Sequence, residues 1–194
     1  MSKSKYKAIA IFGSTSDNID PAFRKPTFET GALLAKNGIT MIFGVGDSGL
    51  MGESFRGVRS ENGKVLGITI PSLLKKQCAD PSIYHKGELR VVKTLHIRKH
   101  LMMEKADALL IAPGGWGTFD EIGSHGVHAK LGDRAVKPVI FLNFNGFWDP
   151  FKTLLNNMLV HGTIKENQIA FVDYANSPNE IFDAIERVKN RLTK

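Results

Sequence analysis

Several features that would mark a special class of protein are missing from this 194-residue sequence. It contains a single cysteine, Cys78, so no disulfide can form within the chain, which is compatible with a reducing cytosol. No apolar run approaches the length that crosses a bilayer, and the first residues lack a signal-peptide core. The net charge of +7 is spread out and forms no basic run interleaved with aromatic residues. We therefore expect a cytoplasmic protein that binds neither a membrane nor nucleic acid.

The length and composition are those of one ordinary globular domain. Hydrophobic residues make up 42% of the chain and charged residues 23%, and a chain of this length buries a sizeable core. No linker, low-complexity segment or internal repeat interrupts the sequence. We expect a single domain over residues 1–194.

Short apolar runs alternate along the chain with stretches of helical pattern. The predicted strands are Ala8–Phe12, Ile39–Phe43, Val65–Ile70, Leu89–Val92, Ala108–Ala112, Val139–Leu142 and Ile169–Val172. The predicted helices are Ala22–Lys36, Leu50–Ser60, Thr94–Lys105, Thr118–Leu131, Phe147–Leu159 and Pro178–Arg191. This alternation predicts an α/β fold with a mostly parallel sheet and helices on both faces, whose ligands bind beyond the carboxyl ends of the strands.

The most informative segment is the glycine-rich turn that follows the strand at Ala108–Ala112. It reads Pro113-Gly114-Gly115-Trp116-Gly117-Thr118-Phe119-Asp120-Glu121. Glycines let the backbone approach a ligand, and the unpaired N–H groups at the start of the following helix favour an anion such as phosphate. A carboxylate has little reason to help bind phosphate. Glu121, one turn into the helix, therefore indicates chemistry on a group attached to that phosphate.

Two other turns follow strands and open onto the same predicted edge. Residues 44–49 match G-x-G-x-x-G, but a dinucleotide site also needs an acidic residue at the end of the next strand, where Gly67–Pro71 has none. We therefore do not expect a bound NAD, and no other cofactor is expected either. The turn at Gly13 and Ser14 has two readings of equal weight: a local helix-entry turn, or part of the ligand cleft.

A cation and several histidines complete the candidate groups. Arg98 lies one strand before the glycine-rich turn, so it can meet Glu121 across the cleft, although a single arginine on a helix is usually a solvated surface residue. It would then either hold Glu121 ionised and oriented or contact the substrate. His96 and His100 stand four residues apart, and Glu121, His125 and His128 share a helical face, but no fixed metal signature is present. We expect no metal.

Six segments, in order along nearly the whole chain, resemble the LOG proteins, which are cytokinin riboside 5′-monophosphate phosphoribohydrolases often mislabelled lysine decarboxylases. Residues 113–121 match their P-G-G-x-G-T-x-x-E signature, and Arg98-Lys99 matches their arginine–lysine pair. The other four segments are residues 13–16, 43–52, 68–71 and 142–148.

The resemblance implies a Rossmann-like three-layer fold, usually a homodimer, that cleaves the N-glycosidic bond of a nucleoside 5′-monophosphate to free base and ribose 5-phosphate. Arg98 and Glu121 fall on the catalytic pair of the family. The other implied substrate-binding positions are Gly13, Ser14, Lys99, Gly114, Gly115, Gly117 and Thr118.

The sequence also departs from the family pattern. Leu95 replaces a methionine, Val45 replaces the second glycine of a triple-glycine turn, and Ser124, Val127, His128 and Lys130 replace glutamate, threonine, tryptophan and glutamine. These positions flank the sugar, the base or the dimer region, so the identity of the released base stays open.

Two classes of function remain. The first is a phosphoribohydrolase acting on a cytokinin riboside monophosphate or an AMP-like nucleotide. The second is a non-catalytic nucleotide or molybdenum-cofactor carrier of the same fold. The retention of both Arg98 and Glu121 favours the enzyme. Lysine decarboxylation is the least favoured, because no lysine stands in a setting suited to a pyridoxal phosphate Schiff base.

Overall fold

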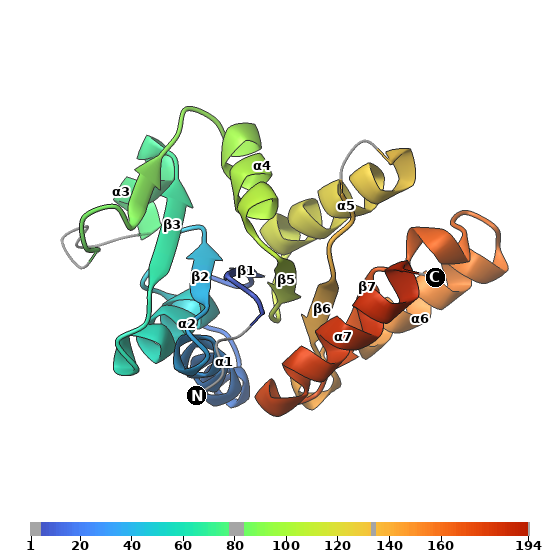
Figure 1. Ribbon diagram of the computed structural model, residues 1–194, viewed down its shortest axis with the longest axis horizontal. Helices are drawn as coiled ribbons and strands as arrows, with labels where there is room; N and C mark the ends of the chain where they lie inside the picture. Colours follow the sequence, from blue (N-terminus) through green and yellow to red (C-terminus); the bar gives the residue numbers. More distant parts are fainter. Residues whose placement is uncertain (1–4, 78–83, 133–134, 194) are drawn as a thin grey trace.

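A computed structural model describes residues 5–77, 84–132 and 135–193, so Cys78 and the first four residues lie outside it. The described strands form one sheet in the order β4-β3-β2-β1-β5-β6-β7, and every neighbouring pair is parallel (Figure 1). The strands are β1 (Ala8–Phe12), β2 (Thr40–Phe43), β3 (Val65–Thr69), β4 (Leu89–Val91), β5 (Ala108–Ile111), β6 (Val139–Leu142) and β7 (Val172–Ala175).

Helices connect these strands and cover both faces of the sheet. They are α1 (Arg24–Lys36), α2 (Gly49–Ser60), α3 (Pro71–Gln77), α4 (Leu95–Lys105), α5 (Trp116–Leu131), α6 (Asp149–Val160) and α7 (Ile181–Leu192). Because parallel connections are right-handed, α1 and α2 cover one face and α4, α5 and α6 the other, while α7, which follows the last strand, lies on the face of α1 and α2 (Figure 1). The expected α/β architecture is confirmed. In the part of the chain that the structure describes, none of these helices combines the length and apolarity that spanning a membrane requires.

The core lies along the middle of the sheet. Strands β5 and β6 are buried at every position, which is why their sequences are continuous apolar runs rather than alternating ones. On the side of β6, Trp148 is 2% exposed, and its indole N–H donates to the carbonyl oxygen of Ile111 at 3.2 Å. This bond joins the segment before α6 to the end of β5, directly before the glycine-rich turn.

Most element boundaries agree with the sequence prediction to within one or two residues, but three elements differ. The helix predicted from Pro178 begins with a 3-10 turn at Pro178–Glu180, and α7 starts at Ile181. The short helix α3 was not predicted. The last strand was predicted at Ile169–Val172, and this is wrong, because the residues that pair with β6 are Val172–Ala175. A turn precedes them, closed by the bond from Val172 N to Ile169 O at 2.9 Å.

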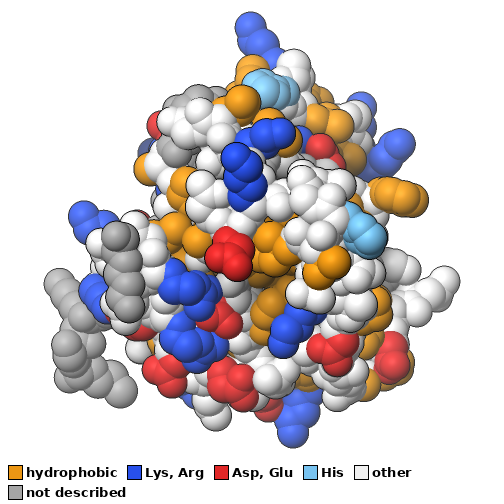
Figure 2. All heavy atoms as spheres, turned by 90° about the vertical axis from the view of Figure 1, so that its right-hand side faces the viewer, with side chains coloured by type: hydrophobic (Ala, Val, Ile, Leu, Met, Phe, Trp, Pro, Cys, Tyr) orange, Lys and Arg blue, Asp and Glu red, His pale blue; other side chains and the backbone are white. Residues whose placement is uncertain are grey.

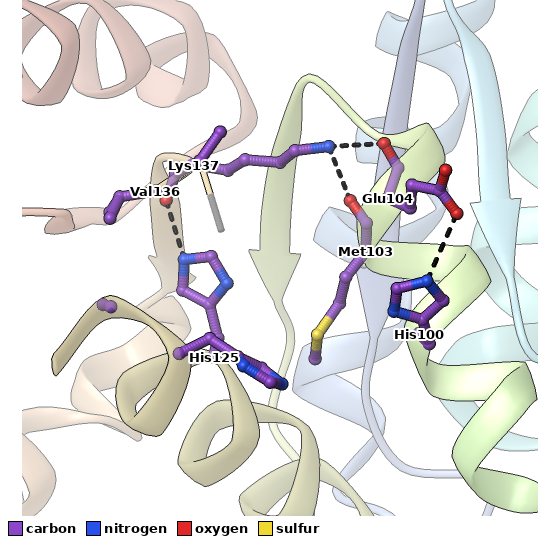
Figure 3. A pocket seen from close by; sticks show the side chains of 9 residues that line it. His100, Met103, Glu104, His125, Val136 and Lys137 are labelled. Atoms are coloured by element: carbon purple, nitrogen blue, oxygen red, sulfur yellow. Dashed lines mark hydrogen bonds and ion pairs between the residues drawn. The ribbon is translucent and has the colours of Figure 1, made fainter. Parts of the chain in front are cut away.

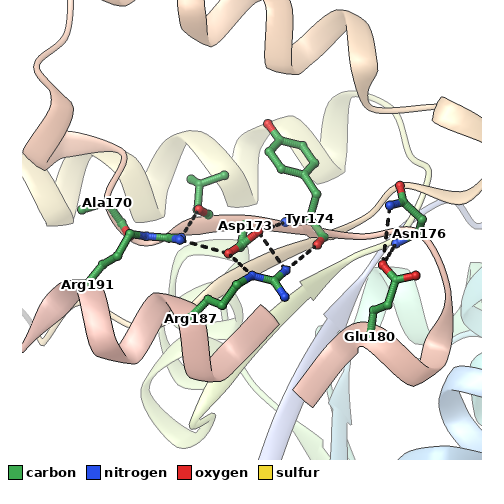
Figure 4. A network of polar contacts seen from close by, with 8 residues as sticks. Ala170, Asp173, Tyr174, Asn176, Glu180, Arg187 and Arg191 are labelled. Carbon is green, nitrogen blue, oxygen red and sulfur yellow. Dashed lines mark hydrogen bonds and ion pairs between the residues drawn. The ribbon is translucent and has the colours of Figure 1, made fainter. Parts of the chain in front are cut away.

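The misplacement of the last strand comes from Asp173, a charged residue inside β7. Its carboxylate receives Arg187 Nε and Arg191 Nη1, each at 3.1 Å, and both arginines lie on α7 (Figure 4). These contacts hold the pKa of Asp173 below its usual range despite burial, which acts in the opposite direction. Asp173 can therefore occupy a strand because two arginines of the following helix neutralise its charge. A local sequence pattern does not reveal this compensation.

The order of the strands reverses direction at β1, which lies between β2 and β5. In open parallel sheets the crevice at such a switch point, beyond the carboxyl ends of the strands, is where ligands bind. The turns after β1, β2 and β5 all open there, as the sequence predicts.

Candidate active site

A cavity of about 420 Å³ lies at this switch point. Its walls come from the turns after β1, β2 and β5 and from the first two turns of α4 and α5, and α2 and α3 each add one residue. The lining residues are Ile11, Phe12, Gly13, Ser14, Thr15, Ser16, Gly44, Val45, Met51, Leu73, Leu95, Arg98, Lys99, Gly115, Trp116, Gly117, Thr118, Asp120 and Glu121. Eight of the nine site residues expected from the sequence are among them, and Gly114 is not.

The start of α5 supplies free backbone donors to this cavity. Gly115 is the N-cap residue, no side chain caps the helix, and the first bond is the one from Phe119 N to Gly115 O at 3.0 Å. The N–H groups of Trp116, Gly117 and Thr118 precede that bond, so they have no acceptor within the helix. Together with the positive end of the helix dipole they form an anion site.

Gly114 has a packing role instead of lining the cavity. A Cβ at this position would lie 2.8 Å from Cβ of Thr118 and closer still to its hydroxyl oxygen. The bare Cα therefore lets Thr118, which is buried, pack beneath the turn. Gly114 itself lines a neighbouring surface cavity with Phe147 and Trp148.

The Ser14 turn combines the two readings that its sequence allows. The backbone of Ser14 donates to Pro113 O and accepts from Leu50 N, each at 2.9 Å, so it ties the β1 turn to the glycine-rich turn and to α2. Its hydroxyl accepts from Ser16 N at 3.1 Å. The same residue faces the cavity.

Arg98 enters the cavity from the first turn of α4. Thr94 caps that helix by accepting from Ile97 N at 3.2 Å, which sets the helix start three residues before Arg98. The guanidinium Nε donates to Ile68 O at 3.0 Å and Nη2 donates to Gly44 O at 3.2 Å. The third nitrogen, Nη1, lies 3.9 Å from Oε1 of Glu121. Arg98 is therefore a fixed, desolvated cation rather than a surface residue.

Glu121 faces Arg98 with its charge incompletely compensated. Its side chain is 13% exposed, and within the described residues it accepts no hydrogen bond. Burial raises the pKa of Glu121 to about 7, against the lowering effect of Arg98 and Lys99, and the neighbouring Asp120 adds to the rise. A carboxyl group with such a pKa can both accept and release a proton near neutral pH.

Lys99 and Asp120 form an ion pair at the rim of the same cavity. Lys99 Nζ lies 2.6 Å from Oδ1 of Asp120, so α4 and α5 are linked one residue after Arg98 and one before Glu121. The lysine is mostly buried, and the aspartate is mostly exposed. Asp120 was not predicted as a site residue, although its place beside Glu121 in the signature is a usable signal.

The histidines lie elsewhere. His125 lines a second cavity of about 340 Å³ together with His100, and its Nε2 is 3.1 Å from the carbonyl oxygen of Lys137, which precedes β6 (Figure 3). His100 pairs with Glu104 at 3.5 Å on the outer part of α4. Across the described ranges, no three His, Cys, Asp or Glu side chains are grouped as a metal site.

Several lining residues were not predicted as part of the site. Gly44 and Val45 come from the turn after β2, Leu73 from α3, and Trp116 from the glycine-rich turn, where its side chain is 90% exposed. The literal G-x-G-x-x-G at residues 44–49 was the available signal for the first two. No sequence signal pointed to Leu73, because the helix on which it lies, α3, was not predicted.

Comparison with known proteins adds three findings. A family model with the description "Possible lysine decarboxylase" matches residues 51–185. The rice (Oryza sativa subsp. japonica) protein named "Probable cytokinin riboside 5′-monophosphate phosphoribohydrolase LOGL9" is 29% identical over 187 residues, which are 96% of this chain and 81% of the rice protein. The Arabidopsis thaliana protein named "Cytokinin riboside 5′-monophosphate phosphoribohydrolase LOG7" is 29% identical over 95% of this chain and 83% of its own length.

Among solved structures, the molybdenum cofactor binding protein from Rippkaea orientalis superimposes with a TM-score of 0.67. It is 23% identical, and the match covers 97% of this chain and 99% of that protein. At this identity the similarity establishes the shared fold.

Proposed function

The chain belongs to the LOG family, and from that premise we propose that its cavity hydrolyses the N-glycosidic bond of a nucleoside 5′-monophosphate, releasing free base and ribose 5-phosphate. One observation carries this proposal. The Arg98–Glu121 pair lies in the wall of the same cavity as the free amides at the start of α5, so a charged reacting group and an anion site stand together.

The 5′-phosphate would bind the backbone N–H groups of Trp116, Gly117 and Thr118. The turn at Gly13 and Ser14, bonded to Pro113, would close the other side of this anion site. Binding energy from the phosphate, which does not itself react, would then orient the sugar toward Glu121.

Glycosidic cleavage develops positive charge at C1′ of the ribose as the bond to the base nitrogen breaks. The electron pair of that bond leaves with the base. Glu121 would stabilise the developing charge and accept a proton from the attacking water, whose oxygen bonds to C1′. The same carboxyl group, with its pKa about 7, would then release this proton to the departing base. Atoms and charge balance with one water consumed.

Arg98 would act on Glu121 rather than bind the phosphate. Its Nε and Nη2 are occupied by main-chain carbonyl oxygens, and its remaining nitrogen faces the carboxylate. Its charge lowers the pKa of Glu121, which keeps a useful fraction of the group ionised near neutral pH. This favours the first of the two roles that the sequence left open.

The substrate class we propose is a cytokinin riboside monophosphate or an AMP-like nucleotide. The two relatives are named as phosphoribohydrolases of cytokinin riboside 5′-monophosphates. A cavity of about 420 Å³ is of the size that holds a small ligand. The apolar side chains of Leu73 and Leu95 lie in its lining and would face the base.

Two other functions receive less support. Lysine decarboxylation requires an unprotonated amine for a Schiff base, whereas Lys99, the lysine in the lining of the described cavity, is held by Asp120. A carrier of a nucleotide or of molybdenum cofactor would need the anion site, but it would have no use for a largely buried Glu121 beside a fixed cation.

We also propose that the protein is a homodimer. Large apolar side chains lie uncovered on α5 and α6, including Val127, Leu131, Leu154 and Val160. Figure 2 faces the side of the molecule on which these helices lie, and hydrophobic side chains stand there in the open between charged ones. A second copy of the chain would cover them.

The test is to incubate the purified protein with a panel of nucleoside monophosphates and measure free base by chromatography. We expect release by the wild type and none by Glu121→Gln or Arg98→Ala, each checked by circular dichroism for an intact fold. Tight binding without base from any nucleotide would contradict the enzyme and support a carrier. Near-normal turnover by either variant would contradict the assigned roles.

A further inference from the structure

The turn after β2 lies in direct contact with Arg98. Arg98 Nη2 donates to Gly44 O at 3.2 Å, and the guanidinium lies directly over the bare Cα of that glycine. A Cβ at position 44 would lie 2.8 Å from Arg98 Cζ and overlap Nη2. Any side chain at this position would therefore occupy the space of the guanidinium.

We propose that Gly44 is a positioning residue for Arg98, whose missing side chain admits the guanidinium and whose carbonyl oxygen fixes its orientation toward Glu121. This assignment rests on the proposed function for its catalytic consequence, but the contact itself is independent of it. It also changes the meaning of the G-x-G-x-x-G pattern, since the first glycine makes room for a side chain of this protein rather than for a dinucleotide.

The second anchor of Arg98 makes the geometry rigid. Nε donates to Ile68 O at 3.0 Å, at the end of β3, while Nη2 is bound at the end of β2. Two hydrogen bonds from one planar group to neighbouring strands define its plane. Nη1 is then the nitrogen left to face Glu121, at 3.9 Å.

Val45 explains why a side chain added at position 44 would displace Arg98 rather than the turn itself. It is a β-branched residue with φ of 68°, in the left-handed region that such residues rarely adopt, and its side chain is buried. A Cβ at Gly67 on β3 would lie 2.6 Å from its Cγ2, so the valine side chain packs against the bare Cα of Gly67. This packing holds the strained backbone in place and with it the carbonyl oxygen of Gly44.

The position of Arg98 therefore depends on packing contacts outside the reacting groups. The side chain of Val45 packs against the bare Cα of Gly67 and fixes the turn after β2, and the carbonyl oxygen of Gly44 in that turn binds Arg98. The φ of Gly44 is not in the left-handed region, so alanine is compatible with its backbone. The only obstacle to Gly44→Ala is the guanidinium, which makes this substitution a specific probe.

The experiment compares Gly44→Ala, Arg98→Ala and the double variant. We expect Gly44→Ala to lower the rate of base release by about 100-fold, the effect of displacing a catalytic group by about an ångström. In the Arg98→Ala background, which releases no base, the added methyl group meets no guanidinium, so it should not lower the thermal midpoint further. The matched control is Gly123→Ala on α5, where nothing lies within 4 Å, and we expect its rate to stay within about twofold of wild type.

A second readout does not need turnover. Titrating the Glu121 carboxyl by carbon-13 NMR should give a pKa near 7 in the wild type and in Gly123→Ala, and a pKa shifted by about one unit or more in Gly44→Ala. If the proposed function fails but this shift appears, the positioning role stands. An unchanged Glu121 titration, or equal losses of stability from Gly44→Ala with and without Arg98, would overturn it. If the single variant does not fold, recovery of folding in the double variant supports the proposal, and failure there contradicts it.

Discussion

Arg98 and Glu121 are close enough to attract one another but too far apart to form a hydrogen bond, with 3.9 Å between Nη1 and Oε1. Arg98 is bound to two main-chain carbonyl oxygens, and Glu121 is left largely buried, with its pKa raised. A tighter pair would hold the carboxylate ionised and inert. The observed separation leaves it able to change its protonation state, and this has consequences for both stability and activity.

We expect Glu121→Gln to stabilise the fold while abolishing base release. Because the folded-state pKa of about 7 lies above the ordinary value of 4.5, the stability that Glu121 contributes is present below pH 4.5 and is lost as the pH rises through 7. The variant should gain about 1 to 3 kcal/mol in unfolding free energy at pH 8, measured by urea denaturation, and nothing at pH 4. The exposed Glu29→Gln is the control and should show no such pH dependence. A loss of stability at pH 8 would contradict the prediction.

The pH profile of kcat/KM should fall on the acid side with an apparent pKa of about 7, because the ionised form of Glu121 accepts the proton from water. The measurement is initial rates over pH 5 to 9 at low substrate concentration. Arg98 lowers the pKa of Glu121, so Arg98→Met, which should release no base, should raise the pKa of the Glu121 carboxyl when it is titrated by carbon-13 NMR. An unchanged Glu121 titration in Arg98→Met would show that Arg98 does not act on this group.

His125 should make the fold sensitive to acid. Its ring is buried edge-on against Phe171, with centroids 5.0 Å apart, and burial lowers the pKa of His125 to about 4. Since this lies below the ordinary 6.5, the stability is present above pH 6.5 and is lost as the pH falls through 4.

For His125→Gln, which keeps a donor for Lys137 O, we expect the loss of unfolding free energy between pH 8 and 5 to be about 2 kcal/mol smaller than in the wild type. The exposed His161→Gln should behave like the wild type. Equal acid sensitivity of all three proteins would exclude His125 as the cause.

The apolar face of α5 and α6 should be the surface on which two copies associate. Val127→Asp places a charge on this face, where the residue is 55% exposed, and should convert a dimer to a monomer in analytical ultracentrifugation. The control is Leu192→Asp on α7, which covers the opposite face of the sheet from α5 and α6. Leu192 is also partly exposed, and this variant should stay dimeric. A wild-type protein that is monomeric at all concentrations would contradict the proposal.

Much of the fold could be predicted because its information is local. Continuous apolar runs such as Val139–Leu142 read directly as buried parallel strands, and alternation with helical patterns led to the α/β architecture. The prediction failed where distant residues compensate a local signal. Asp173 is unfavourable in a strand on local criteria, but its ion pairs with Arg187 and Arg191 of α7 compensate its charge.

The sequence by itself determined the residue types of the candidate site, because the glycines, Glu121 and Arg98 stand in recognisable motifs at the ends of strands. Only the tertiary structure decided how they act. Burial raises the pKa of Glu121, the carbonyl oxygens of Gly44 and Ile68 orient Arg98, and Gly114 packs on Thr118 instead of facing the cavity. The physical reason is that desolvation and close contact depend on which strands are neighbours, and the order of the strands in the sheet is not a local property of the chain.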